Sequence, residues 1–451
     1  MRLSQAARFC DGQLHGADVE FSRVSTDTRD IRSGDLFVAL RGERFDGHDF
    51  IADAEKSGAA AVLCELPVAG LPSVVVGDSR RALGLLAAGW AAQYSLTRIA
   101  VTGNAGKTTV KEMIACMLSA RPADTAVHAT IGNLNNDIGV PLTLLGVNAT
   151  HRYGVFELGA NAPGEIAWTS SLVRPQIVMI TNVTGAHLEG FGSMQGIANA
   201  KSEIYCATAP DAVAIVNADD QFAGFFTTQA LKAELRIVTV GQYGGADWRA
   251  EQISLNGASV DFVLLHEGHR YNVHLPLPGV HQVNNALMAI AAVAEAGISI
   301  DEALPRLNQL QPVKGRMNIT PCMGGTLVDD SYNANPGSVR VAVDWLAEQQ
   351  TPQALVLGDL GELGPDEIEI HQQLGEYARA AGLDRLIAVG ALAAHAAAAF
   401  GQGAEQAEGH QSAARLVQPL LAQGGTVLVK GSRSAGMDAV ITVLQSIEEK
   451  H

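Results

Sequence analysis

The segment 102–109, which reads Thr-Gly-Asn-Ala-Gly-Lys-Thr-Thr, constrains this chain more than any other feature. It lies between an apolar run at 98–102, typical of a buried strand, and a stretch at 107–118 with helical character. Glycines let the backbone curl so that its N–H groups face a phosphate, and the start of the helix adds its positive dipole end. The Lys would reach the terminal phosphates and the following Thr would bind Mg²⁺. The segment therefore predicts a site for a nucleoside triphosphate.

This loop is shorter than the common G-x-x-x-x-G-K-[ST] pattern, because the first glycine of that pattern would fall at Val101. A chance glycine-rich turn is the competing interpretation, and the strand-loop-helix context makes it the weaker one. Hydrolases, switches, transferases and ligases all use such loops. The loop alone therefore does not decide the function.

The length of 451 residues favours several domains, because one hydrophobic core rarely grows so large. Strand-like apolar runs alternate with helical stretches after residue 98 and again after 313, which favours mainly parallel sheets with crossover helices. At about 248–275 the alternation is that of a small antiparallel insert. We therefore expect an α/β protein of three domains: a small α/β domain (1–82), a central P-loop domain with a mostly parallel sheet (83–312) and a C-terminal Rossmann-like domain (313–451).

Composition argues against several classes of protein. The formal net charge of -16 argues against a protein that grips nucleic acid. The five cysteines are scattered and include no C-x-x-C pair, which disfavours a disulfide scaffold or a zinc site and fits a reducing compartment. Neither a signal peptide nor an apolar stretch long enough to span a membrane is visible. We expect a cytoplasmic protein without stable membrane association.

Further segments occur in the order found in one enzyme family. They read GNLNNDIGVP at 132–141, FELGAN at 156–161, ITNV and AHLE between 180 and 189, AKSEIY at 200–205, DDSYNANP at 329–336 and KGSRSA at 430–435. Together with the short loop they resemble the Mur ligases, relatives of the folylpolyglutamate synthetases. The last two segments, with TDTR at 26–29 and the segment 42–50, are similar to the branch that adds D-alanyl-D-alanine to a UDP-linked muramoyl tripeptide. The resemblance spans all three expected domains.

The resemblance implies an ATP-dependent, ADP-forming ligase of peptidoglycan precursor synthesis, and so a part in cell-wall biogenesis, cell shape and cell division. Its substrates would be UDP-N-acetylmuramoyl-tripeptide and D-alanyl-D-alanine, and we expect a monomer. The family reaction phosphorylates a carboxylate, and the amine then attacks the acyl phosphate. Such a site must neutralise the charges of the nucleotide and the carboxylate.

The resemblance also assigns residues to ATP and metal ions. Glu157 would bind Mg²⁺ together with Thr108, since hard cations prefer oxygen ligands, and His187 would bind a second ion. Lys201 matches a lysine that CO₂ converts into a carbamate in this family, which would turn a cation into a metal-binding anion. The expected catalytic residues are Lys107, Glu157, His187, Lys201 and Arg316. The expected ATP contacts are Gly103, Asn104, Ala105, Gly106, Lys107, Thr108, Thr109, His281, Gln282, Asn285, Arg316 and Asp330.

Gln282 stands where relatives usually have Asn, and it offers the same amide groups on a longer arm. Asp330 resembles an acid that holds the ribose hydroxyls. The substrates are expected to contact polar residues of all three domains: Thr26, Asp27, Arg29, Arg44, Asp46, His48, Asn135, Asn136, Tyr332, Asn333, Asn335, Lys430, Ser432 and Arg433.

Plainer interpretations stay open. A lone helical lysine such as Lys201 is usually solvated, an Asn-rich stretch such as 135–137 is a natural turn, and 329–336 reads as a strand end before a Pro-started helix. Among functions, the alternatives are the family member that adds the third peptide residue, a folylpolyglutamate synthetase, and a P-loop ATPase outside the ligases. The sequence lacks the D-N-P-R-type signature of the first alternative. It leaves open which third residue the peptide carries.

Overall fold

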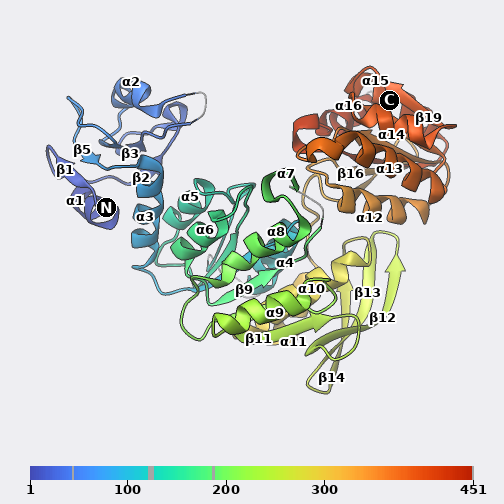
Figure 1. The fold of residues 1–451 in the computed structure, drawn as a ribbon, viewed down its shortest axis with the longest axis horizontal. Helices are drawn as coiled ribbons and strands as arrows, with labels where there is room; N and C mark the ends of the chain where they lie inside the picture. Colours follow the sequence, from blue (N-terminus) through green and yellow to red (C-terminus); the bar gives the residue numbers. More distant parts are fainter. Residues whose placement is uncertain (43–44, 120–125, 185–187, 449–451) are drawn as a thin grey trace.

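The computed structural model describes residues 1–448 apart from 43–44, 120–125 and 185–187. The chain forms three lobes in a row, from the blue N-terminal lobe to the red C-terminal lobe (Figure 1). Within the described residues each lobe has its own sheet, of five, nine and six strands in chain order. The expected α/β class with mostly parallel sheets is confirmed.

The first lobe has a sheet of order β1-β5-β4-β3-β2, parallel except where β1 joins β5. Its elements are α1 (Leu3–Phe9), β1 (Gln13–His15), β2 (Arg23–Ser25), β3 (Asp35–Val38), α2 (Ile51–Lys56), β4 (Ala61–Cys64) and β5 (Ser73–Val75). Helix α3 (Ser79–Ala91) follows, capped by the side chain of Asp78. Its first half packs in the core of this lobe and its second half in the core of the next, so the two lobes share one helix.

The central lobe has the strand order β14-β13-β12-β11-β10-β9-β6-β8-β7. The strands from β7 to β12 are parallel, and β13 and β14 continue the sheet as antiparallel strands. The antiparallel pairing expected at 248–275 is present, and these strands extend the main sheet. Its strands are β6 (Thr97–Thr102), β7 (Val127–Ala129), β8 (Tyr153–Glu157), β9 (Ile177–Ile180), β10 (Val213–Asn217), β11 (Arg236–Gly241), β12 (Trp248–Asn256), β13 (Ser259–His266) and β14 (His269–Leu275).

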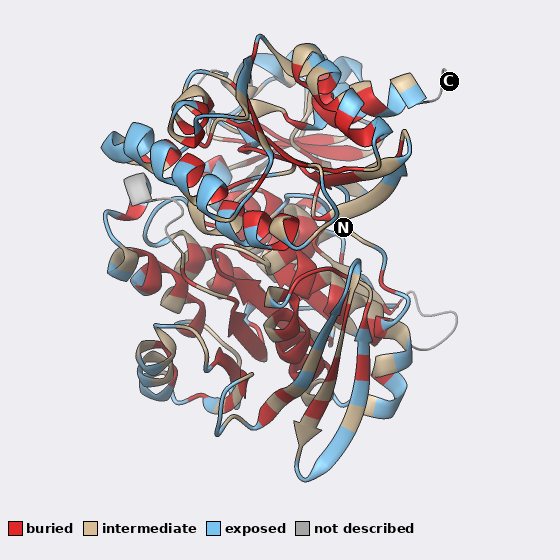
Figure 2. Cartoon of the chain, turned by 90° about the vertical axis from the view of Figure 1, so that its right-hand side faces the viewer, coloured by how far each residue is buried: buried red, intermediate tan, exposed pale blue. Residues whose placement is uncertain are grey.

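Helices cover both faces of this sheet, because successive strand side chains point to opposite faces. On β6, Ile99 and Val101 pack with α4 and α10, whereas Ala100 packs on the other side. Figure 2 shows the buried strands between helices whose outer faces are exposed. The helices are α4 (Lys107–Leu118), α5 (Gly139–Leu145), α6 (Glu165–Val173), α7 (Leu188–Phe191), α8 (Met194–Ser202), α9 (Ala223–Lys232), α10 (His281–Glu295) and α11 (Ile300–Leu307).

The third lobe has the order β15-β16-β20-β17-β18-β19, and β15 is its antiparallel edge. Its strands are β15 (Asn318–Cys322), β16 (Gly325–Asp330), β17 (Gln353–Gly358), β18 (Arg385–Val389), β19 (Ala404–Ala407) and β20 (Thr426–Lys430). Its helices are α12 (Pro336–Ala347), α13 (Glu367–Ala380), α14 (Ala393–Phe400), α15 (His410–Ala422) and α16 (Asp438–Glu448). Because β16 and β20 are parallel neighbours, the expected site residues at their carboxyl ends lie side by side. No helix in the described part of the chain is long and apolar enough to cross a bilayer.

Candidate active site

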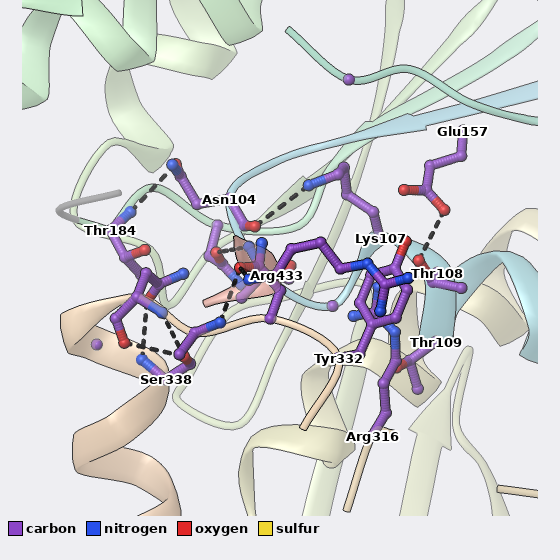
Figure 3. Close-up of a pocket in the computed structure, with 18 of the residues that line it drawn as sticks. Asn104, Lys107, Thr108, Thr109, Glu157, Thr184, Arg316, Tyr332, Ser338 and Arg433 are labelled. Atoms are coloured by element: carbon purple, nitrogen blue, oxygen red, sulfur yellow. Dashed lines mark hydrogen bonds between the residues drawn. The ribbon is translucent and has the colours of Figure 1, made fainter. Parts of the chain in front are cut away.

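A cavity of about 590 Å³ lies between the central and C-terminal lobes (Figure 3). Its walls come from the loop before α4, the end of β8, helix α8 and the start of α10 on one side. On the other side they come from 315–317, the segment from β16 into α12, and the residues around the end of β20. Loops after the carboxyl ends of parallel strands from two sheets thus face one cavity, the usual place for a ligand in open α/β proteins.

The loop 103–106 curls at the cavity wall because glycine permits its backbone. Gly106 has φ of 80° and is the N-cap of α4, and an added Cβ there would lie 2.7 Å from Asn285 Oδ1. The first N–H groups of a helix have no intrahelical acceptor, so the start of α4 offers donors to an anion. Lys107 Nζ crosses the loop and donates to the carbonyl oxygens of Gly103 at 2.8 Å and Asn104 at 3.2 Å. Burial lowers the pKa of Lys107, and the charge of Glu157 partly opposes that shift.

The end of β9 holds this loop in shape through residues that sequence reasoning missed. The Asn182 side chain accepts from the Ala105 N–H at 3.0 Å and donates to the Ala105 carbonyl at 3.1 Å. Thr181 Oγ1 donates to the same carbonyl at 2.6 Å. The sequence does carry a signal for them. Two polar residues, Thr181 and Asn182, directly follow the apolar strand β9, which pairs with the strand β6 that precedes the loop. Other cavity residues that were not predicted include Asn161, Glu165, Thr184, Gly337, Ser338 and Val341.

Glu157 is the buried carboxylate of the site, at 2% exposure. Its Oε2 accepts from Thr108 Oγ1 at 2.8 Å and its Oε1 accepts from Asn135 Nδ2 at 2.8 Å. Among the described residues no group of three or more His, Cys, Asp or Glu side chains could hold a metal by itself. Two protein oxygens beside a phosphate loop fit Mg²⁺, because Mg²⁺ commonly takes one or two protein oxygens and completes its shell with nucleotide phosphates and water. His187 lies outside the described residues.

Lys201 lines the cavity from α8 and is not a solvated helix residue. Only 1% of it is exposed, and its Nζ lies 5.5 Å from the centroid of the Phe191 ring. Burial, together with the nearby charge of Lys107, lowers its pKa to about 7. A large fraction of this amine is therefore neutral near physiological pH.

Two arginines flank Tyr332 on the C-terminal side of the cavity, as Figure 3 shows. The guanidinium carbons of Arg316 and Arg433 lie 4.6 Å and 5.4 Å from the ring centroid. Arg316 Nε is buried and has no hydrogen-bond partner. Buried polar groups usually have a partner, so this orphaned donor in a cleft is consistent with an anionic ligand. Tyr332 holds both cations in place without neutralising them.

Asp330 and Lys430 form a buried ion pair across the ends of β16 and β20. Lys430 Nζ donates to Asp330 Oδ2 at 2.5 Å, and Asp330 Oδ1 accepts from the Met317 N–H at 3.1 Å. Both carboxylate oxygens of Asp330 thus have partners within the C-terminal lobe. Asn333 Oδ1 accepts from the Arg433 N–H at 3.2 Å, which ties the two strand-end loops together. These contacts shape the wall of the cavity.

Two further C-terminal residues have structural partners. The Asn335 side chain caps α12 in a reciprocal capping box with Ser338, which matches the plainer interpretation of this segment while Asn335 still lines the cavity. Ser432 Oγ donates to the Asp359 carbonyl at 2.5 Å and is not among the lining residues.

Three of the expected ATP contacts, His281, Gln282 and Asn285, line the cavity at the start of α10. Asn285 Nδ2 donates to Gln282 Oε1 at 2.8 Å, so the longer side chain of Gln282 contacts the side-chain amide of Asn285. Burial, and then the charge of Lys430, lowers the pKa of His281 to about 4. His281 is therefore neutral at pH 7.

Those expected substrate residues of the first lobe that the structure describes do not line the cavity. Asp27 pairs with Arg29 at 2.6 Å, and these hydrogen bonds lower the pKa of Asp27 to about 2. His48 Nε2 accepts from the Glu65 N–H at 3.0 Å, so Nδ1 carries the proton and donates to Asp46 Oδ1 at 2.5 Å. Thr26 belongs to the same lobe, which lies at the far end of the molecule from the C-terminal lobe (Figure 1). Arg44 lies outside the described residues.

Comparison with known proteins gives consistent matches along the chain. The model of the Mur ligase middle domain matches residues 101–293, that of the Mur ligase glutamate ligase domain 315–433, and that of the Mur ligase family catalytic domain 20–91. UDP-N-acetylmuramoyl-tripeptide--D-alanyl-D-alanine ligase of Escherichia coli strain K12 is 42% identical over 98% of both chains.

Solved structures extend this similarity to three dimensions. A crystal structure of MurF from Acinetobacter baumannii has a TM-score of 0.92 and 37% identity over 98% of both chains. MurF ligase from Thermotoga maritima in complex with ADP has a TM-score of 0.83 and 26% identity, over 95% of this chain and 98% of that one.

Proposed function

This chain belongs to the Mur ligase family, and from that premise we propose that it is the ATP-dependent ligase that joins D-alanyl-D-alanine to UDP-N-acetylmuramoyl-tripeptide. The observation that carries the proposal is one cavity that unites the nucleotide loop with the segment 329–336, in a chain matched end to end by ligases of that specificity. The end-to-end identity argues against a third-residue synthetase, a folylpolyglutamate synthetase and a P-loop ATPase outside the ligases. The substrates are nucleotide-linked cell-wall precursors and ATP, so the reaction is cytoplasmic.

The reaction uses ATP and forms ADP. A carboxylate oxygen of the tripeptide attacks the γ-phosphorus, the bond to ADP breaks, and an acyl phosphate forms. The amino group of D-alanyl-D-alanine then attacks the carbonyl carbon, loses a proton, and inorganic phosphate leaves. Lys107 and Arg316 supply positive charge from opposite walls of the cavity, where negative charge develops. Mg²⁺, held by Thr108, Glu157 and phosphate oxygens, would supply further charge neutralisation.

The three lobes divide the substrates among them in this proposal. The UDP moiety binds the first domain (1–82), ATP binds the central domain (83–312), and the dipeptide binds the C-terminal domain (313–451). Support comes from the cavity, which lies between the second and third lobes, and from the separate place of the first lobe at the other end of the molecule (Figure 1). An elongated UDP-muramoyl peptide would therefore extend from the first lobe to the cavity.

We also propose that Lys201 is carbamylated in the active enzyme. The ammonium group first loses a proton, and the neutral amine nitrogen then attacks CO₂ and releases a second proton to give a carbamate. The loss of two protons and the gain of CO₂ convert a cation into an anion. The lowered pKa of about 7 supports this, because only the neutral amine reacts with CO₂. Its position in the cavity wall, with the charge of Lys107 nearby, favours the anionic product.

The carbamate is tested with ¹³C-labelled bicarbonate and NMR of the intact protein. A carbamate carbon signal is expected that disappears in Lys201→Arg, because the guanidinium does not form a carbamate. Lys232→Arg, at an exposed lysine of α9, is the matched control and should keep the signal. Absence of the signal from the wild type, together with activity that does not depend on dissolved CO₂, would rule the carbamate out.

The ligase assignment is tested by phosphate release from ATP and Mg²⁺. Release should require both UDP-muramoyl-tripeptide and D-alanyl-D-alanine, and the product should be heavier by the dipeptide less water. Release with UDP-muramoyl-dipeptide and a free diamino acid would instead indicate the third-residue synthetase. Hydrolysis of ATP with no muramoyl substrate consumed would refute the ligase function.

A further inference from the structure

Lys111 is a buried cation that none of the roles above uses. It lies on α4 one turn beyond Lys107, and only 2% of it is exposed. Its Nζ donates to the carbonyl oxygen of Thr130 at 2.6 Å and pairs with Glu112 Oε1 at 2.6 Å. Burying an ammonium group is unfavourable unless its partners are well placed. Such a cation beneath the nucleotide loop therefore points to a role in how the site is built.

Thr130 connects this ammonium to the carboxylate of the site. Thr130 follows β7 and is buried, and its N–H donates to the Val155 carbonyl at 3.0 Å. Its Oγ1 accepts from the backbone N–H of Glu157 at 3.0 Å. The Glu157 carboxylate in turn accepts from Thr108 Oγ1, which lies on α4 like Lys111. The contacts thus form a closed ring that starts and ends on α4.

We propose that Lys111 is a positioning residue for the pair of Mg²⁺-binding oxygens on Thr108 and Glu157, and that it acts through Thr130. The inference rests on the nucleotide-dependent function proposed above. The two oxygens belong to different elements, so their separation depends on how the end of β8 is fixed to α4. Mg²⁺ requires near-ideal octahedral geometry, so a small displacement of one oxygen weakens binding. Without Lys111 the Thr130 carbonyl would also be a buried acceptor lacking its cation.

The experiment measures ADP binding by calorimetry over a series of Mg²⁺ concentrations. Lys111→Met keeps the apolar stem and removes the ammonium, and Thr130→Val keeps the volume and the carbonyl but removes the hydroxyl. In both variants the Mg²⁺ concentration for half-maximal ADP binding should rise about tenfold or more. Replacing residues that hydrogen-bond to metal ligands typically has an effect of this size. ADP affinity without Mg²⁺ should change little. In the double variant this Mg²⁺ concentration should rise no further than in each single variant, because both substitutions break the same chain of hydrogen bonds.

Arg98→Met is the matched control. Arg98 lies near the start of β6, at the end of that strand away from the nucleotide loop. It donates to the carbonyls of Val173 at 2.9 Å and Ala91 at 2.7 Å. It should lower stability and leave the Mg²⁺ dependence unchanged. If Lys111→Met or Thr130→Val behaves like Arg98→Met, the proposal is overturned. Thr130→Val tests the path even if Lys111→Met fails to fold. A wild type that binds ADP with Mg²⁺ but performs no ligation would refute the ligase and leave this test intact.

Discussion

At the scale of single residues, the cavity places cations where phosphate charge would arrive. Lys107, Arg316 and Arg433 line it, while Glu157 is the buried anion beside the loop. Asn135 and Thr108 hold both oxygens of that carboxylate by hydrogen bonds. Such fixed groups stabilise developing charge without having to reorganise during the reaction.

Replacement of Glu157 by Gln tests the carboxylate with almost no change of shape. We expect phosphate release to fall by about 100-fold or more and the Mg²⁺ requirement to rise, since a charged oxygen ligand is lost. Steady-state rates over a Mg²⁺ series measure this. Glu295→Gln, at a residue paired with Arg236 away from the cavity, should keep normal rates. Equal rates for Glu157→Gln and the wild type would remove Glu157 from the mechanism.

His281 predicts an acid-sensitive part of the stability. Its pKa of about 4 in the folded protein lies below the ordinary value of 6.5, chiefly because of burial. The unfolded chain therefore takes up this proton first, and the stability gained from neutral His281 is lost as the pH falls from about 6.5 to about 4. His281→Gln should weaken the decline of urea midpoints between pH 7 and pH 4.5. An unchanged decline would show that His281 titrates normally.

At the scale of elements, strand ends and helix starts build the site. Helix α4 begins at Lys107, and α12 begins at Pro336 on the opposite wall of the cavity. A capping box fixes the start of α12, with Asn335 accepting from the Ser338 N–H and Ser338 accepting from the Asn335 N–H.

Asn335→Ala should lower the free energy of unfolding by about 1 kcal/mol, because two backbone donors at the start of α12 lose their partners or their orientation. Thermal unfolding of the C-terminal lobe measures it. Ser338→Ala should have a smaller effect, since the backbone N–H at position 338 still donates to Asn335 Oδ1. Equal stability for Asn335→Ala and the wild type would show that the cap contributes nothing.

At the scale of the whole molecule, the first two lobes share α3, and Arg80 on this helix forms a two-bond ion pair with Asp137 of the central lobe. The cavity lies instead at the boundary between the second and third lobes. Substrates that contact several lobes draw them together when they bind.

We therefore expect X-ray scattering to show a smaller radius of gyration when an ATP analogue, Mg²⁺ and UDP-muramoyl-tripeptide are all present. Each ligand alone should have less effect, because ATP and the muramoyl peptide together fill the cavity between the second and third lobes. The Arg80→Ala variant should close in the same way if the movement is at the third lobe. Identical dimensions with and without the full set of ligands would contradict closure.

The sequence by itself determined the nucleotide loop, the α/β class and the order of the chemistry-bearing segments. These depend on local patterns: glycines before a helix, apolar runs that alternate with helical stretches, and polar residues directly after strands. The starts of α4 at Lys107 and of α12 at Pro336 could be predicted because both depend on local patterns.

Only the tertiary structure decided which of these residues meet. It paired Lys430 with Asp330, placed Tyr332 between two arginines, buried Lys201 and Lys111, and made the strands after 248 part of the central sheet. It also kept the polar residues of the first lobe away from the cavity. Burial and long-range partners depend on how elements distant in sequence pack. The local sequence around a helical lysine therefore does not distinguish a solvated side chain from a buried one.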